Sequence, residues 1–274
     1  MTTSTASAAL PAYSRPQRVT QARVMKSEWT KLRTQPAALW SLLSAVVLVV
    51  AFGVLYSLLR VARPPHGAAT ASFDPVSVSL SGVQLAQIAV GVLGVLLITG
   101  EYATGLIRTT VAAVPKRLPA LWGKAAMMTA AILAIGLPAS FVTFTAGQSV
   151  LARQHLSTTL SQPGVTRAVI GCALYLAVAG LLGLALGTLL RSTAGGISAL
   201  FGVLFALPIV AGFLPGSLSD EVNKYLPGTA GQAIVTVHPD PATSLAPWTG
   251  FGVFCAYAAV LLVLAAIRMR RGDA

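Results

Sequence analysis

The chain has 274 residues, of which 55% are hydrophobic and only 9% are charged, and its mean hydropathy is +0.77. A soluble domain has about a quarter of its residues charged, so this composition excludes an ordinary soluble protein and indicates a single membrane domain. The formal charge of +12 lies mainly between apolar runs, which argues against a nucleic-acid partner and favours charges that orient the chain in a lipid bilayer.

The N-terminal region precedes the first long apolar run. Residues 1–20 are rich in Ser, Thr, Pro and Ala, which predicts a disordered tail without a cleaved signal sequence. After it we expect an amphipathic helix with Trp29 on the apolar face and Arg23, Lys26 and Lys31 off that face. This pattern is typical of a helix at the membrane surface, and an ordinary basic flank of the first span is the alternative. Residues 21–274 are expected to form one membrane domain.

Charge-free windows define the membrane spans. Six windows of at least 23 residues have no charged residue, and a charge at mid-bilayer costs about 2.5–3.5 kcal/mol. A helix needs about 20 residues to cross about 30 Å of hydrocarbon. The sequence therefore predicts an all-α integral membrane fold with six transmembrane helices, near Ala37–Leu59, Val83–Thr99, Ala125–Gln148, Ala168–Leu190, Ala194–Leu214 and Pro247–Ile267.

The distribution of Lys and Arg predicts the orientation. Fourteen of the 19 basic residues fall on the side of the membrane that holds the N-terminus, and five fall on the other side. This bias predicts cytoplasmic N- and C-termini, and it places the segment between the second and third helices in the cytoplasm. On the outer side, before the sixth helix, we expect a short helix capped by Ser217 and ending at Leu226. An apolar piece from Ala230 to Val237, too short to span, follows it.

Glycine and polar side chains within the spans predict contacts between helices. Gly180, Gly183 and Gly187 share one face of the fourth helix, where we favour internal packing over dimerisation. Pro138 and Pro208 are expected to bend the third and fifth helices. Four polar residues are candidates for lining a translocation path, although hydrogen bonding between helices is the favoured reading: Gln84, Gln87, Ser140 and Thr143.

Motifs for chemistry are absent from the sequence. There is no G-x-x-x-x-G-K-[ST], H-E-x-x-H or G-x-S-x-G, so we expect no ATP site, no catalytic residue and no metal site in this chain. The proposed spans also lack interior charges, which argues against a self-powered transporter. A charge-poor path would suit a hydrophobic or amphipathic cargo.

The stretch Gly100–Arg117, GEYATGLIRTTVAAVPKR, is the most polar and most patterned segment between the spans. Leu106, Ile107 and Val111 fall close to helical spacing, and Pro115 ends the pattern. We expect a short amphipathic helix at the membrane surface that could dock into a soluble partner. A solvated loop whose charges only set the topology is the alternative.

This stretch resembles the cytoplasmic loop of permeases in the ABC-2 family of ATP-binding-cassette exporters. The pattern G-E-x-x-x-G followed by P-x-R is carried by Gly100, Glu101, Gly105, Pro115 and Arg117. Two further stretches are similar to segments of the same family, 27–36 (SEWTKLRTQP) and 225–234 (YLPGTAGQAI).

The resemblance implies a six-helix permease in a bacterial plasma membrane. Two permease subunits, identical or different, would work with two ATPase subunits that hold ATP and magnesium. The segment would be the coupling helix, with Glu101 tying it to its membrane entrance and with these contact residues: Gly105, Leu106, Ile107, Arg108, Val111, Pro115, Lys116 and Arg117. Arg108 stands where many members carry an acidic residue, which puts the choice of ATPase in doubt.

Two other classes of protein stay open. A non-transporting multi-span scaffold or sensor would have no bound ATPase. A membrane enzyme would need polar residues that converge at membrane depth, and none are evident in the sequence.

Overall fold

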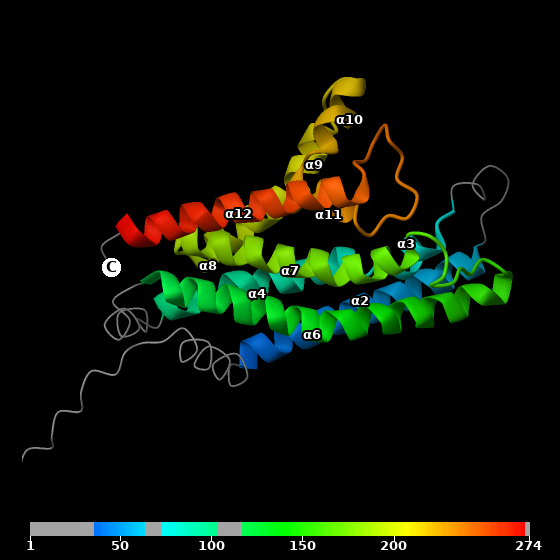
Figure 1. The fold of residues 1–274 in the computed structure, drawn as a ribbon, viewed down its shortest axis with the longest axis horizontal. Coiled ribbons are helices and arrows are strands. Elements are labelled where there is room, and N and C mark those ends of the chain that lie inside the picture. The colour runs from blue at the N-terminus through cyan, green and yellow to red at the C-terminus, as the bar shows by residue number, and fades with distance from the viewer. Residues whose placement is uncertain (1–35, 64–72, 104–116, 272–274) are drawn as a thin grey trace, which may run out of the picture.

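The computed structural model describes residues 36–63, 73–103 and 117–271, and within these ranges the protein is all-helical (Figure 1). Six helices are long and apolar enough to cross a membrane, as predicted. The predicted tail and the predicted surface helix, with Arg23, Lys26, Trp29 and Lys31, lie outside the described residues. So do residues 104–116, which hold most of the predicted coupling helix.

Five of the crossings are single helices: α2 (Pro36–Ala62), α4 (Val83–Ala103), α6 (Arg117–Leu151), α7 (Val165–Leu190) and α12 (Pro247–Arg271). The other crossing consists of α8 (Thr193–Phe201), the π-helical turn η3 (Gly202–Ala206) and α9 (Leu207–Ala211). Four short helices lie in the connections: α3 (Pro75–Ser79), η2 (Ala152–Gln154), α10 (Ser217–Asn223) and α11 (Pro227–Gln232).

Helix α7 is the centre of the bundle, with 83% of its apolar stretch buried and with contacts to α4, α6, α8 and α12. Glycines bring its backbone against α4. A Cβ atom at Gly183 would lie 2.0 Å from the carbonyl oxygen of Gly91, and one at Gly94 would lie 2.1 Å from that of Gly180. Small residues allow such close approach of membrane helices. The glycine face of α7 therefore packs against other helices of the same chain, as predicted.

The fifth membrane-crossing segment contains a π-helical turn in addition to a proline. The N–H of Leu207 donates to the carbonyl of Gly202, which closes a π-helical turn directly before Pro208. Proline has no N–H, so the helix loses one hydrogen bond there, and a π-turn is a common local adjustment. In Figure 1, α9 and α10 lead away from the long helices. Only 22% of this crossing is buried.

The connection before α12 contains two short helices, and the first of them differs from the predicted one in its cap and its end. Helix α10 begins at Ser217, but the cap position belongs to Gly216, which has φ +51° and ψ −132°, and no side chain caps the helix. The prediction that Ser217 caps it was therefore wrong, because Ser217 is already helical. The helix also ends at Asn223 rather than Leu226. Helix α11 then starts with Pro227 at its first position, where the missing N–H has no intrahelical partner to lose.

The third long helix starts earlier than predicted. Helix α6 begins at Arg117 rather than at Ala125, and it runs unbroken through Pro138 to Leu151. The predicted span began after Lys124 because spans were placed in charge-free windows, but this lysine lies inside the helix and is only 5% exposed. Its environment leads to the candidate site.

Candidate functional site

A buried ion pair joins the end of α4 to the first part of α6. The Nζ atom of Lys124 lies 2.7 Å from Oε1 of Glu101, and both side chains are at most 6% exposed. A charge-assisted hydrogen bond of this length is among the stronger polar contacts in proteins. The pair brings together residues that precede and follow 104–116, the part of the predicted coupling segment that lies outside the described residues. Glu101 is thus paired with a residue of the helix that follows the segment.

The last turn of α4 also contacts the connection between α7 and α8. The hydroxyl of Thr193 donates to that of Thr99 at 2.9 Å. The guanidinium of Arg191 lies over the ring of Tyr102, 5.7 Å from its centre, which is a cation–π distance. Arg191 itself has φ +52° and ends α7 with its N–H on the carbonyl of Gly187. One turn of α4 therefore contacts α6, the end of α7 and the start of α8.

The structure describes only part of the predicted coupling residues. Glu101 is placed by its contact with Lys124, and Arg117 is the first residue of α6. The other predicted contact residues lie outside the described ranges: Gly105, Leu106, Ile107, Arg108, Val111, Pro115 and Lys116. Lys124 was not predicted as a site residue, because its charge was counted only toward the orientation of the chain. The signal was present, since Glu101 and Lys124 are charges that directly border charge-free windows at the two ends of one connection.

Two of the four candidate path residues belong to a polar network. The amides of Gln84 in α4 and Gln232 in α11 bond reciprocally, at 2.5 and 2.9 Å. The Gln87 amide donates to the backbone carbonyl of Gln84 at 3.0 Å and accepts from the Tyr175 hydroxyl in α7. Tyr175 stacks on Phe254 of α12 at 5.1 Å between ring centres. These glutamines therefore bond to other helices, and Gln84 is the exposed end of the network.

The other two candidates bond to their own helix. Ser140 donates to the carbonyl of Gly136 at 2.8 Å, and Thr143 donates to that of Ala139 at 2.7 Å. Both residues are buried. Backbone bonding of this kind satisfies a hydroxyl inside a membrane helix without a second partner. In this conformation, neither side chain faces an open path.

Helix α11 and the turns after it, residues 227–237, form a wedge that packs on α12 and reaches α7 at Tyr175 and Arg167. The Arg167 guanidinium in the first turn of α7 donates to the carbonyls of Ile234 and Thr236, both at 3.0 Å. A Cβ atom at Gly231 would lie 2.6 Å from the Phe254 ring and 2.7 Å from the Tyr175 ring. The wedge is therefore held at one end by Arg167 and in the middle by close packing. The predicted apolar piece is in fact the end of this short helix and the turns that follow it.

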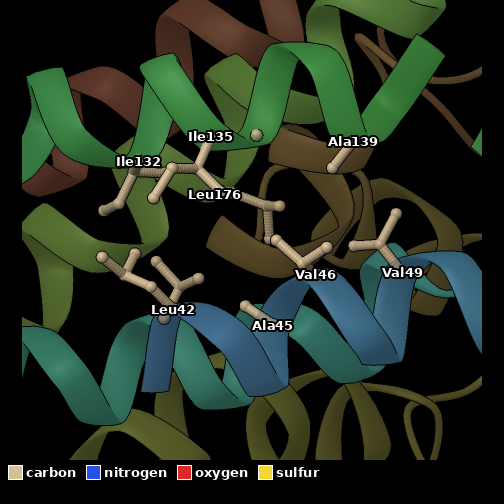
Figure 2. A pocket seen from close by; sticks show the side chains of 10 residues that line it. Leu42, Ala45, Val46, Val49, Ile132, Ile135, Ala139 and Leu176 are labelled. Atoms are coloured by element: carbon tan, nitrogen blue, oxygen red, sulfur yellow. The ribbon is translucent and has the colours of Figure 1, made fainter. Parts of the chain in front are cut away.

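A small apolar cavity lies between α2 and α6, with α4 and α7 behind it (Figure 2). Its volume is about 20 Å³, roughly the space that one water molecule needs. Every side chain around it is apolar, so water has no partner there. The cavity is too small for a transported molecule. Its lining residues are Leu42, Ala45, Val46, Val49, Val90, Ile132, Ile135, Gly136, Ala139 and Leu176.

Two polar clusters of the described residues thus lie near opposite ends of α4. Among the described residues no group of three or more His, Cys, Asp and Glu side chains could hold a metal ion. A scan against models of protein families and a search of curated proteins find no match to this chain.

Proposed function

We propose that the protein is the membrane-spanning permease subunit of an ATP-binding-cassette exporter of the ABC-2 type, in a bacterial plasma membrane. The observation that carries the proposal is the buried Glu101–Lys124 pair, which brackets the segment that resembles the coupling loop of that family. A loop that only set topology would have no need of a buried charge pair at its base, since burying charges is costly. The six apolar helices supply the expected scaffold.

In the proposed mechanism a separate ATPase subunit binds ATP and magnesium and closes on a second copy. Its surface groove takes the segment 100–117, with Leu106, Ile107 and Val111 as the apolar contact. Closure of the ATPase pair displaces this segment and, with it, the last turn of α4. Two permease subunits, identical or different, face each other around the path. The apolar interior of the described helices favours a hydrophobic or amphipathic cargo.

Co-purification tests the proposal. The tagged protein is purified in mild detergent from its native membrane, and ATP hydrolysis is measured on the product. We expect a stoichiometric P-loop ATPase, and we expect Ile107→Asp to lose it because a carboxylate in an apolar groove is desolvated without a partner. Leu218→Asp is the matched control, because Leu218 is 52% exposed on α10, far along the chain from the segment.

Both variants must elute as single, monodisperse species, which excludes unfolding as the cause of a loss. Wild-type protein that retains no ATPase would refute the exporter and favour the scaffold or sensor. An Ile107→Asp variant that keeps the full amount of ATPase would refute the placement of the contact.

A further inference from the structure

The Glu101–Lys124 pair links two helices whose main contacts are elsewhere. Helix α4 packs mostly on α7 and α2, and α6 packs mostly on α2 and α7. The ion pair therefore does not reinforce an extensive α4–α6 interface. It is a side-chain bridge between parts of two helices that make few other direct contacts with each other.

The two charges are poor candidates for simple stabilisers of the fold. Taking both from water is costly, and well-packed apolar residues of the same volume often stabilise a protein as well or better. Glu101 also lies in the last turn of α4, where the negative end of the helix dipole opposes a carboxylate. A role in positioning α4 relative to α6 explains the pair better than a contribution to the stability of the fold does.

The neighbours of Glu101 indicate what is positioned. Thr99 and Tyr102 connect the same turn to Thr193 and Arg191 at the α7–α8 connection. A displacement of the segment after α4 therefore changes contacts with three elements at once. The ion pair joins the helix before that segment to the helix after it, because Lys124 lies on α6.

We propose that Glu101 and Lys124 form a clasp that makes the inner ends of α4 and α6 move together when the segment between them is displaced. This inference rests on the proposed function and names Lys124 as a positioning residue that acts through Glu101. With the clasp closed, the ATPase cannot complete its cycle without moving both helices. With the clasp broken, the ATPase cycles without that load, so hydrolysis is uncoupled from the membrane helices.

The test measures ATP hydrolysis per bound ATPase subunit in the purified complex, without added cargo. We expect Glu101→Gln and Lys124→Met each to raise this rate about fivefold or more, the lower end of typical coupling between sites. The co-purified amount of ATPase should stay unchanged, because neither residue is in the predicted apolar contact. The charge swap Glu101→Lys/Lys124→Glu should return the rate to that of the wild type.

Two controls separate the clasp from a merely structural pair. The double variant Glu101→Gln/Lys124→Met has neither charge, so it avoids leaving one charge without its partner, and it should show the same raised rate. A structural pair would lower the thermal midpoint of the single variants and leave hydrolysis per bound ATPase unchanged. Unchanged hydrolysis in the single variants, or a swap that fails to restore it, would overturn the clasp.

Heating the permease by itself tests the ion pair independently of any ATPase. Each single variant should unfold at a lower temperature, and the swap should recover most of the loss. Equal midpoints in all variants would overturn the clasp whether or not an ATPase binds. Wild-type protein without an ATPase would instead refute the proposed function and the coupling role, while the heating result would still report on the pair.

Discussion

The contact between α4 and α7 makes a sharp prediction for Gly183→Ala. The new Cβ atom would lie 2.0 Å from the carbonyl oxygen and 3.2 Å from the Cα atom of Gly91, both of them backbone atoms. Ordinary contact begins at 3.4 Å, so the oxygen must move about 1.4 Å, the difference between these two distances. No side-chain rotation can supply this movement. The two helices must separate along a surface that includes the buried residues Val90, Leu93 and Ile98.

The expected change in the free energy of unfolding is the balance of two opposed effects. Overpacking a well-filled interior costs about 1–3 kcal/mol, and a backbone clash belongs at the upper end. Alanine in a helix gains about 1 kcal/mol over glycine. We expect a net loss of about 2 kcal/mol, which lowers the midpoint of thermal unfolding by about 4–8 °C for a chain of this size. Gly252→Ala in α12 is the matched control, because a Cβ there meets nothing within 4 Å.

The assay heats each purified variant in the same detergent and measures the monodisperse fraction that remains by size-exclusion chromatography. Gly252→Ala should match the wild type or exceed it by up to about 4 °C, since it keeps the propensity gain without a clash. If Gly183→Ala behaved like Gly252→Ala, the α4–α7 backbone contact would be refuted, and with it the account of the glycine face.

Two further variants probe the wedge and the cavity. The lysine of Arg167→Lys cannot donate from two nitrogens in a fixed fork, as the guanidinium does. We therefore expect the backbone amides of 233–237 to exchange hydrogen at least several-fold faster, while exchange in the middle of α7 stays unchanged. Unchanged exchange in 233–237 would show that packing alone holds the wedge. Gly136→Ala places a methyl group beside the apolar cavity, 3.5 Å from the Ala173 Cβ, and should raise the thermal midpoint by about 2–4 °C. A lower midpoint would mean that the cavity wall cannot accept a methyl group.

The membrane spans were predictable because a charge in hydrocarbon is so costly that charge-free windows mark them. The same rule explains the main error. The rule began the third span only after Lys124, because the sequence does not reveal that Glu101 neutralises this lysine within the protein. The π-turn before Pro208 could not be predicted from sequence periodicity either. A proline in a helical pattern indicates a disturbed helix, but it does not specify how the neighbouring carbonyls are satisfied.

One residue of the candidate ion pair was singled out from the sequence, but its partner was not. Glu101 was singled out because it follows an apolar run directly, whereas its pairing with Lys124 depends on how α4 and α6 are brought together by α2 and α7. The role of Arg167 was hidden for the same reason. It bonds to carbonyls about seventy positions later in the chain, and no local pattern encodes such a contact.

Helix α4 connects the two polar clusters, and its packing determines how it can transmit movement. It carries Glu101 near one end and Gln84 with Gln87 near the other, about 21–26 Å apart along the helix axis. Between them, Gly91 and Gly94 hold its backbone against α7, so bending α4 alone would open that contact. Displacement of the end that carries Glu101 is therefore expected to move α4 and α7 as one body. Arg167 of α7 donates to the carbonyls of Ile234 and Thr236, and Gln84 of α4 bonds to Gln232, so that body holds the wedge by hydrogen bonds from both of its helices. On the proposed function, the wedge is accordingly the outer element that displacement of the coupling segment would reach first.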